Sequence, residues 1–124
     1  MATNSGENLR IHGLVAATDL SAKQYYVVML ATTAKQVKVS SGATANNVGI
    51  LQNDPAAGEP ASVVAGGMTK ALAGGTINPG DLVTANTTAQ CVATTTANNK
   101  VVGKAITGAG DGELFEIFAG LSNF

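Results

Sequence analysis

Short apolar runs, each closed by glycine, asparagine or proline, recur along the whole chain. They are rich in valine, isoleucine and aromatic residues, which favour strands, and none keeps the 3.6-residue period of a long helix. Turn signals at intervals of roughly 8–12 residues are typical of an all-β sandwich or barrel. We therefore predict an all-β fold, a small antiparallel β-sandwich or barrel of short strands. The predicted strands are 9–15, 25–30, 37–39, 48–51, 61–65, 68–72, 81–84, 90–93, 101–106 and 113–118.

Three glycine-containing segments carry the clearest turn signals. Gly66-Gly67 separates two short strand patterns and predicts a two-residue hairpin. Pro79-Gly80 suits the centre of a type II turn, because proline presets the first φ angle and glycine accepts a positive second one. The segment 107–112 predicts a final hairpin between the last two strands.

The last predicted strand is apolar on both faces. Phe115 and Ile117 point to one side, and Leu114 and Phe118 point to the other. A strand of a small antiparallel sheet normally keeps one face in water. We expect one face to cover the core and the other to form an interface, with Leu114 and Phe118 as candidates.

The strand predicted over 25–30 has the same two-sided character. Its first residues, Tyr25 and Tyr26, are the only tyrosines in the chain. By the same argument we expect one face of this strand to meet an interface, and both tyrosines are candidate contacts.

The N-terminus differs from the rest of the chain, since residues 1–8 are polar and have no periodicity. We predict a mobile N-terminal arm over 1–8 and a single β domain over 9–124, a length that suits one hydrophobic core. Such an arm could add a strand to the edge of a neighbouring sheet. The candidate contacts in the arm and the strand after it are Thr3, Asn4, Glu7, Leu9 and Ile11.

The composition of the chain limits the classes of partner that it is expected to bind. Charged residues make up only 12% of the chain, and seven Lys or Arg against eight Asp or Glu give a net charge of −1. This charge attracts neither nucleic acid nor an anionic membrane, and no apolar run approaches the roughly 18 residues of a membrane-spanning helix. We predict no nucleic-acid partner, no membrane partner and no secretory signal. A surface with so few charges is expected to be partly covered by other protein.

The chain lacks the residues of a catalytic or metal centre. His12 and Cys91 are the only histidine and cysteine, so neither an internal disulfide nor a Cys/His metal site can form. The carboxylates are expected at solvated loop ends, and Gly108–Gly112 leads into a strand, unlike a phosphate-binding loop. We predict no catalytic residue, no cofactor and no metal, hence a structural or binding protein.

The order of the turns and strands resembles a known family over roughly residues 45–118. The segments that carry the resemblance are Val48-Gly49-Ile50-Leu51, Asp54, Gly58-Glu59-Pro60, Val63-Val64, Gly66-Gly67, Ala73-Gly74-Gly75, Pro79-Gly80-Asp81-Leu82-Val83, Val102-Gly103-Lys104-Ala105 and Asp111-Gly112-Glu113-Leu114-Phe115-Glu116-Ile117. In this pattern the chain is similar to the small capsid cement or head-decoration proteins of tailed bacteriophages.

The resemblance implies a virion protein, commonly a homotrimer, that adds to the outside of an expanded capsid after assembly in the host cytoplasm. Its implied partners are the major capsid protein, whose subunits it would bridge, and other copies of itself. The alternative is a small β carbohydrate- or receptor-binding module of a phage fibre or cell surface. That alternative would need a stacking platform, and the chain has no tryptophan.

Overall fold

The computed structural model describes residues 8–11 and 13–123, and this part of the chain contains ten β-strands and no helix. The all-β prediction is therefore confirmed. The strands are β1 (Asn8–Ile11), β2 (Val15–Ala16), β3 (Val27–Leu30), β4 (Gln36–Val39), β5 (Asn47–Leu51), β6 (Val63–Leu72), β7 (Leu82–Ala85), β8 (Cys91–Ala93), β9 (Lys100–Ala105) and β10 (Leu114–Asn123).

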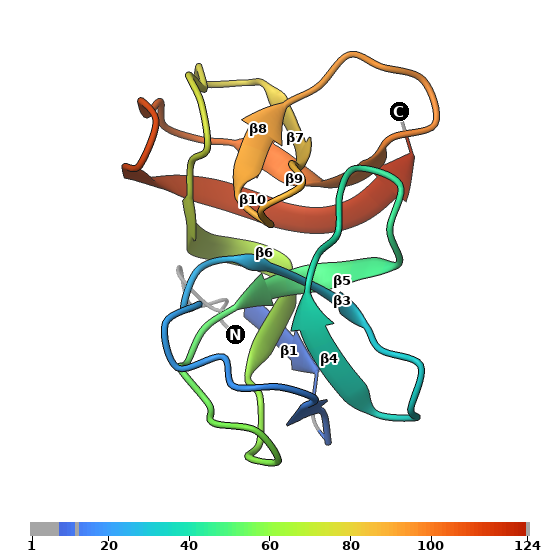
Figure 1. Cartoon of the computed structure of the whole chain (residues 1–124). Coiled ribbons are helices and arrows are strands. Elements are labelled where there is room, and N and C mark those ends of the chain that lie inside the picture. Colours follow the sequence, from blue (N-terminus) through green and yellow to red (C-terminus); the bar gives the residue numbers. More distant parts are fainter. Residues whose placement is uncertain (1–7, 12, 124) are drawn as a thin grey trace, which may run out of the picture.

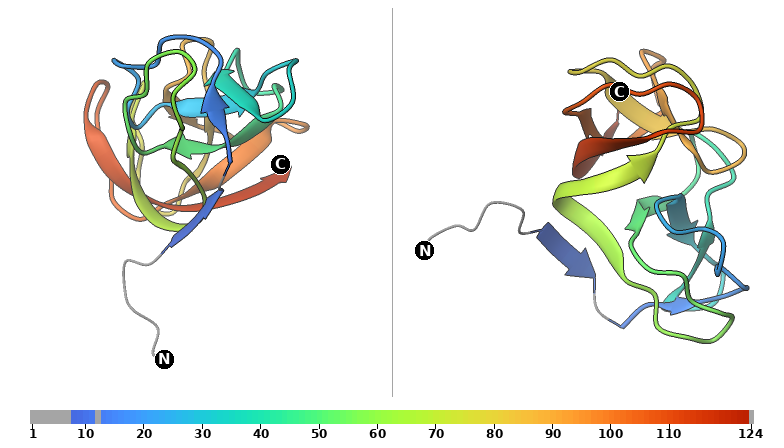
Figure 2. Two further views of the ribbon diagram at one scale, coloured as in Figure 1. Left: turned by 90° about the horizontal axis from the view of Figure 1, so that it is seen from below. Right: turned by 90° about the vertical axis from the view of Figure 1, so that its left-hand side faces the viewer.

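The strands form one curled sheet in the order β2-β4-β3-β5-β6-β10-β9-β7-β8, and β1 pairs with β6 beside this path. Every strand pair is antiparallel except β2 with β4. In Figure 1, β3, β4 and β5 lie in the lower half of the molecule and β7 to β10 in the upper half. The long strand β6 runs from one half into the other and joins them (Figures 1 and 2).

The expected hairpin at Gly66-Gly67 is wrong, because β6 continues through both glycines from Val63 to Leu72. The glycines bend the strand: Gly67 has a φ of +92°, and the register with β1 skips one residue of β6 beside Gly66. Glycine inside a strand marks such bends and bulges. The bend allows one strand to belong to both halves of the sheet.

Two hydrophobic cores lie on opposite sides of β3 and β5. Val27 and Ile50 belong to the core that also contains Phe115 and Ile117 of β10. Their chain neighbours Val28 and Leu51 belong to the second core, and all four side chains are fully buried. The remaining members of this second core are Leu14, Ala16, Leu20, Val37, Ala61 and Val63.

This arrangement corrects the prediction for residues 25–30. The expectation that one face of this strand forms an interface is wrong for Val27 and Val28, because the chain itself covers both faces. The strand also begins at Val27, two residues later than predicted. Tyr25 has a φ of +73°, a left-handed conformation that departs from the regular extended backbone and that a bulky residue rarely adopts.

Other strand boundaries are set by glycine and proline in the turns. The strand predicted over 9–15 is divided into β1 and β2, and Gly13 between them has a φ of +86°. The turn at Pro79-Gly80 is confirmed, since the Asp81 amide donates to the Asn78 carbonyl over 3.1 Å and Gly80 has a φ of +91°. The hairpin predicted between the last two strands is also confirmed, with β9 antiparallel to β10.

Candidate interaction surface

Strand β10 divides its side chains between the core and the solvent. Phe115 and Ile117 are buried in the core, whereas Leu114 and Phe118 are exposed. The alternation is what a pleated strand produces when the molecule covers only one of its faces. Leu114 and Phe118, both predicted as interface residues, therefore lie on the uncovered side.

Neighbouring strands add apolar residues to this side. Phe118 lies opposite Met68 of β6, and Leu114 lies opposite Leu72 of the same strand. Directly opposite residues share a face of the sheet and stand close enough to contact each other. We name the solvent-facing side of β6, β9 and β10 the outer face.

Strand β1 extends the outer face at one end. Leu9 pairs with Gly66, and a Cβ atom on that glycine would lie 3.5 Å from Leu9 Cβ, so the leucine lies over the glycine. Leu9 is 67% exposed, compared with 55% for Phe118 and 47% for Leu114. These three side chains place large apolar groups in water on the outer face. Ile11, by contrast, is half-buried and packs against the second core.

Three charged side chains interrupt the apolar surface. Glu116 lies opposite Lys70 of β6, and Lys104 of β9 lies opposite Phe118. Cross-strand pairing places opposite charges near each other on the same face. The outer face thus combines large apolar side chains with both signs of charge, a composition suited to contact with protein.

The two tyrosines lie in the turn that precedes β3 and are half-buried. The Tyr25 amide donates to the Leu51 carbonyl over 2.7 Å, and its carbonyl accepts from the Leu72 amide over 3.1 Å. The Lys23 ammonium lies 4.8 Å from the centre of the Tyr26 ring, a cation–π distance. These contacts connect the turn to β5 and β6.

The remaining predicted contacts, Thr3, Asn4 and Glu7, lie outside the described residues, as does His12. Sequence reasoning missed Met68, Leu72 and the exposed Ile106, which follows β9 and donates its amide to the Glu116 carbonyl of β10. No local pattern marks them, because they join the outer face through their register with β10.

The described residues offer little for chemistry. Among residues 8–11 and 13–123, no group of three or more His, Cys, Asp or Glu side chains could hold a metal ion. Cys91 is completely buried in the core, and burial raises the pKa of its thiol to about 12. A neutral, enclosed thiol is a poor nucleophile.

The described residues form no helix that is long and apolar enough to cross a bilayer.

Comparison with known proteins identified a matching family and solved structures with a similar fold. A family model described as phage cement protein matches residues 16–119. The crystal structure of the head fiber gp8.5 N base of bacteriophage phi29 has a similar fold, with a TM-score of 0.70 and 17% sequence identity. The match covers 95% of this chain and 98% of the phi29 chain. No curated protein sequence matches the chain.

Proposed function

The chain belongs to the phage cement protein family, and from this we propose that it attaches to expanded heads and bridges neighbouring major capsid subunits. It is a structural protein of the phage capsid and a component of the capsid exterior. The proposal concerns how it acts there: as a stabilising clamp between subunits.

The outer face is the observation that carries this proposal. Leu9, Leu114 and Phe118 are the kind of side chains that a monomeric protein buries, yet about half or more of each is exposed to water. Burying apolar surface is favourable by about 25 cal/mol per Å². We infer that the outer face is covered by protein in the assembled virion.

The low charge of the chain supports the same role. Removing ions from water is costly unless they are well paired, and only 12% of the residues are charged. The outer face can therefore be covered after few charges are desolvated. When one particle makes several linked contacts at once, these add up to firm attachment, so each contact needs only modest affinity.

Two further aspects of the proposal concern assembly. We propose that the protein forms a homotrimer, so that each particle presents three copies of the outer face to its surroundings. We also propose that residues 1–8 contribute to attachment, through Thr3, Asn4 and Glu7. A structural role, with no catalysis, agrees with the buried neutral thiol of Cys91.

Binding to bare expanded heads tests the proposal directly. Purified protein should bind the heads at a fixed copy number and raise the temperature at which they rupture. Unexpanded heads serve as the control and should bind less protein. Absence of binding to expanded heads would contradict the proposed function.

The same assay, repeated with a deletion of residues 1–7, tests the N-terminal contribution. The shortened protein should keep its thermal unfolding temperature and bind heads more weakly. Equal binding by the two proteins would remove residues 1–7 from the attachment site.

A further inference from the structure

The sheet forks where β5 and β10 meet the same edge of β6. Strand β1 pairs with Val63 to Gly67 along one edge of β6, which leaves the opposite edge for both other partners. On that edge β5 pairs with Val63 and Val64, and β10 pairs with Gly66 to Leu72. Beyond these pairings, the start of β5 and the end of β10 diverge from β6.

Glycine makes the close approach at the fork possible. A Cβ atom on Gly49 of β5 would collide with the Val64 carbonyl oxygen of β6. Strand β5 can therefore lie tightly against β6 at Val64 and separate from β10 immediately before it.

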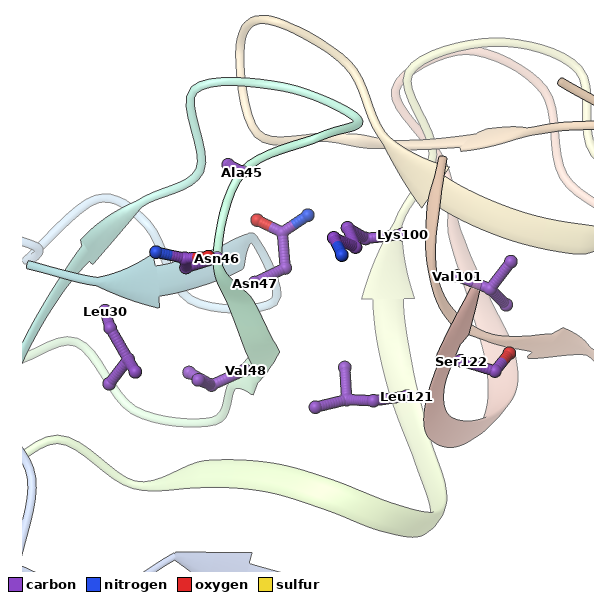
Figure 3. A pocket seen from close by; sticks show the side chains of 9 residues that line it. All are labelled: Leu30, Ala45, Asn46, Asn47, Val48, Lys100, Val101, Leu121 and Ser122. Carbon is purple, nitrogen blue, oxygen red and sulfur yellow. The ribbon is translucent and has the colours of Figure 1, made fainter. Parts of the chain in front are cut away.

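A cavity of about 380 Å³ lies between the two diverging strands. Figure 3 places the apolar side chains of Leu30, Val48 and Leu121 along one side of it, and Asn47 and Lys100 along the other. Leu30 and Leu121 are both exposed at its rim. The volume lies in the lower part of the range for ligand pockets, ~300–1,000 Å³.

Both walls of the cavity are strand edges. Asn47 of β5 pairs with β3 on its outer side, and the pairing of β5 with β6 includes only Ile50 and Leu51. Ser122 of β10 pairs with β9, and the pairing of β10 with β6 stops at Gly120. Within the described residues, no strand pairs with either wall on the side of the cavity. Unpaired strand edges bind extended peptides through backbone hydrogen bonds.

Charge and polarity define the partner further. Among the described residues that line the cavity, Lys100 is the only charged one. The Asn47 side chain is 7% exposed, and its Oδ1 atom has no hydrogen-bond donor in the described part of the chain. A peptide amide could supply this donor after a small displacement of the loop that precedes β5.

We propose that this cavity, the fork site, binds an extended segment of the major capsid protein in which an acidic residue neighbours a large apolar one. The backbone of the segment pairs with β5 or β10, its carboxylate faces Lys100, and its apolar side chain packs among Leu30, Val48 and Leu121. The inference rests on the proposed function, and it identifies the fork site as the part of the protein that binds the capsid.

Three variants of the full chain test the fork site on expanded heads. Lys100→Glu reverses its charge and Leu121→Asp places a charge on its apolar rim. Lys38→Glu is the control, since Lys38 is also a strand lysine but is exposed on β4, outside the cavity, whereas Lys100 is half-buried. Thermal unfolding of each purified variant verifies its fold, and native mass gives its oligomeric state.

We expect Lys100→Glu and Leu121→Asp each to weaken head binding by about tenfold or more, and Lys38→Glu to leave it unchanged. A fourth variant, Lys100→Gln, should reduce the dependence of binding on salt concentration, because it removes the ion pair. Normal binding by folded Lys100→Glu and Leu121→Asp proteins would overturn the fork site and leave the proposed function intact. Failure of the unaltered chain to bind heads would overturn both.

Discussion

Strands β3 and β10 have the same sequence character and opposite surroundings. Each is apolar on both faces, yet Val27 and Val28 of β3 are both fully buried, whereas β10 buries Phe115 and exposes Phe118. Strand β3 lies between β4 and β5 with a core on either side, so the chain covers both of its faces. Strand β10 has a core on one side only.

The difference shows what apolar residues on both faces of a strand predict about its surroundings. Such a strand predicts that both faces meet apolar surroundings in the functional state. Whether the same chain provides both surroundings depends on the path of the sheet, which is set by pairings between distant segments. The uncovered face of β10 is the one that requires a partner, and this requirement leads to the proposed role on the capsid.

The largest expected effect comes from a charge on the buried side of β10. Phe115→Asp should prevent stable folding, because removing a buried phenylalanine alone costs about 3–5 kcal/mol and burying a carboxylate adds to this. Circular dichroism and thermal unfolding would measure the loss. A well-folded Phe115→Asp protein would contradict the assignment of this face to the core.

A smaller loss of stability is expected at β3, and it should be equal on the two faces. Val27→Thr and Val28→Thr each place a hydroxyl group in a different core without changing the size of the side chain. Each should lower the free energy of unfolding by about 1–3 kcal/mol in urea titrations. If only one of the two lost stability, β3 would resemble β10 and the comparison would fail.

A substitution on the outer face of β10 should impair assembly and hardly change the free energy of unfolding. Phe118→Asp should change the free energy of unfolding by less than about 1 kcal/mol, since exposed positions tolerate substitution. Head binding or trimer formation should fall strongly, and native mass separates the two. Loss of the trimer would assign the outer face to contacts between copies, and an intact trimer that no longer binds heads would assign it to the capsid. A variant that still forms trimers and binds heads normally would leave the outer face without a partner.

At neutral pH the smallest effect is that of the Cys91 thiol. Its thiol has a pKa of about 12 in the folded protein against an ordinary value of 9.0, so below pH 9 the thiol is protonated in both states. Between these values it ionises only in the unfolded chain, and stability therefore falls as the pH rises. Cys91→Ala should show a shallower decline of unfolding free energy above pH 9. Identical slopes for the two proteins would contradict the burial of the thiol.

Much of the fold could be predicted because its strands carry local signals. The alternation in β10 separates Phe115 from Phe118 correctly, and Pro79-Gly80 fixes its turn through the φ angles of proline and glycine. These predictions succeed because the information lies within a few neighbouring residues.

The predictions fail where contacts between distant segments determine the structure. Gly66-Gly67 has the composition of a hairpin turn, and only the pairing of β6 with β10, about fifty residues further along the chain, makes it a bend within one strand. The second core behind Val28 likewise depends on Leu14, Leu20 and Ala61, which lie outside the strands and reach this core only through the path of the whole chain. The fork site was invisible for the same reason, since it is created by the divergence of β5 and β10.

A cryo-electron microscopy map of expanded heads decorated with the purified protein tests the central claim most directly. We predict that Leu114 and Phe118 of the outer face lie in contact with a major capsid subunit or with a second copy of the chain. Density that shows this face open to solvent in every bound copy would contradict the account.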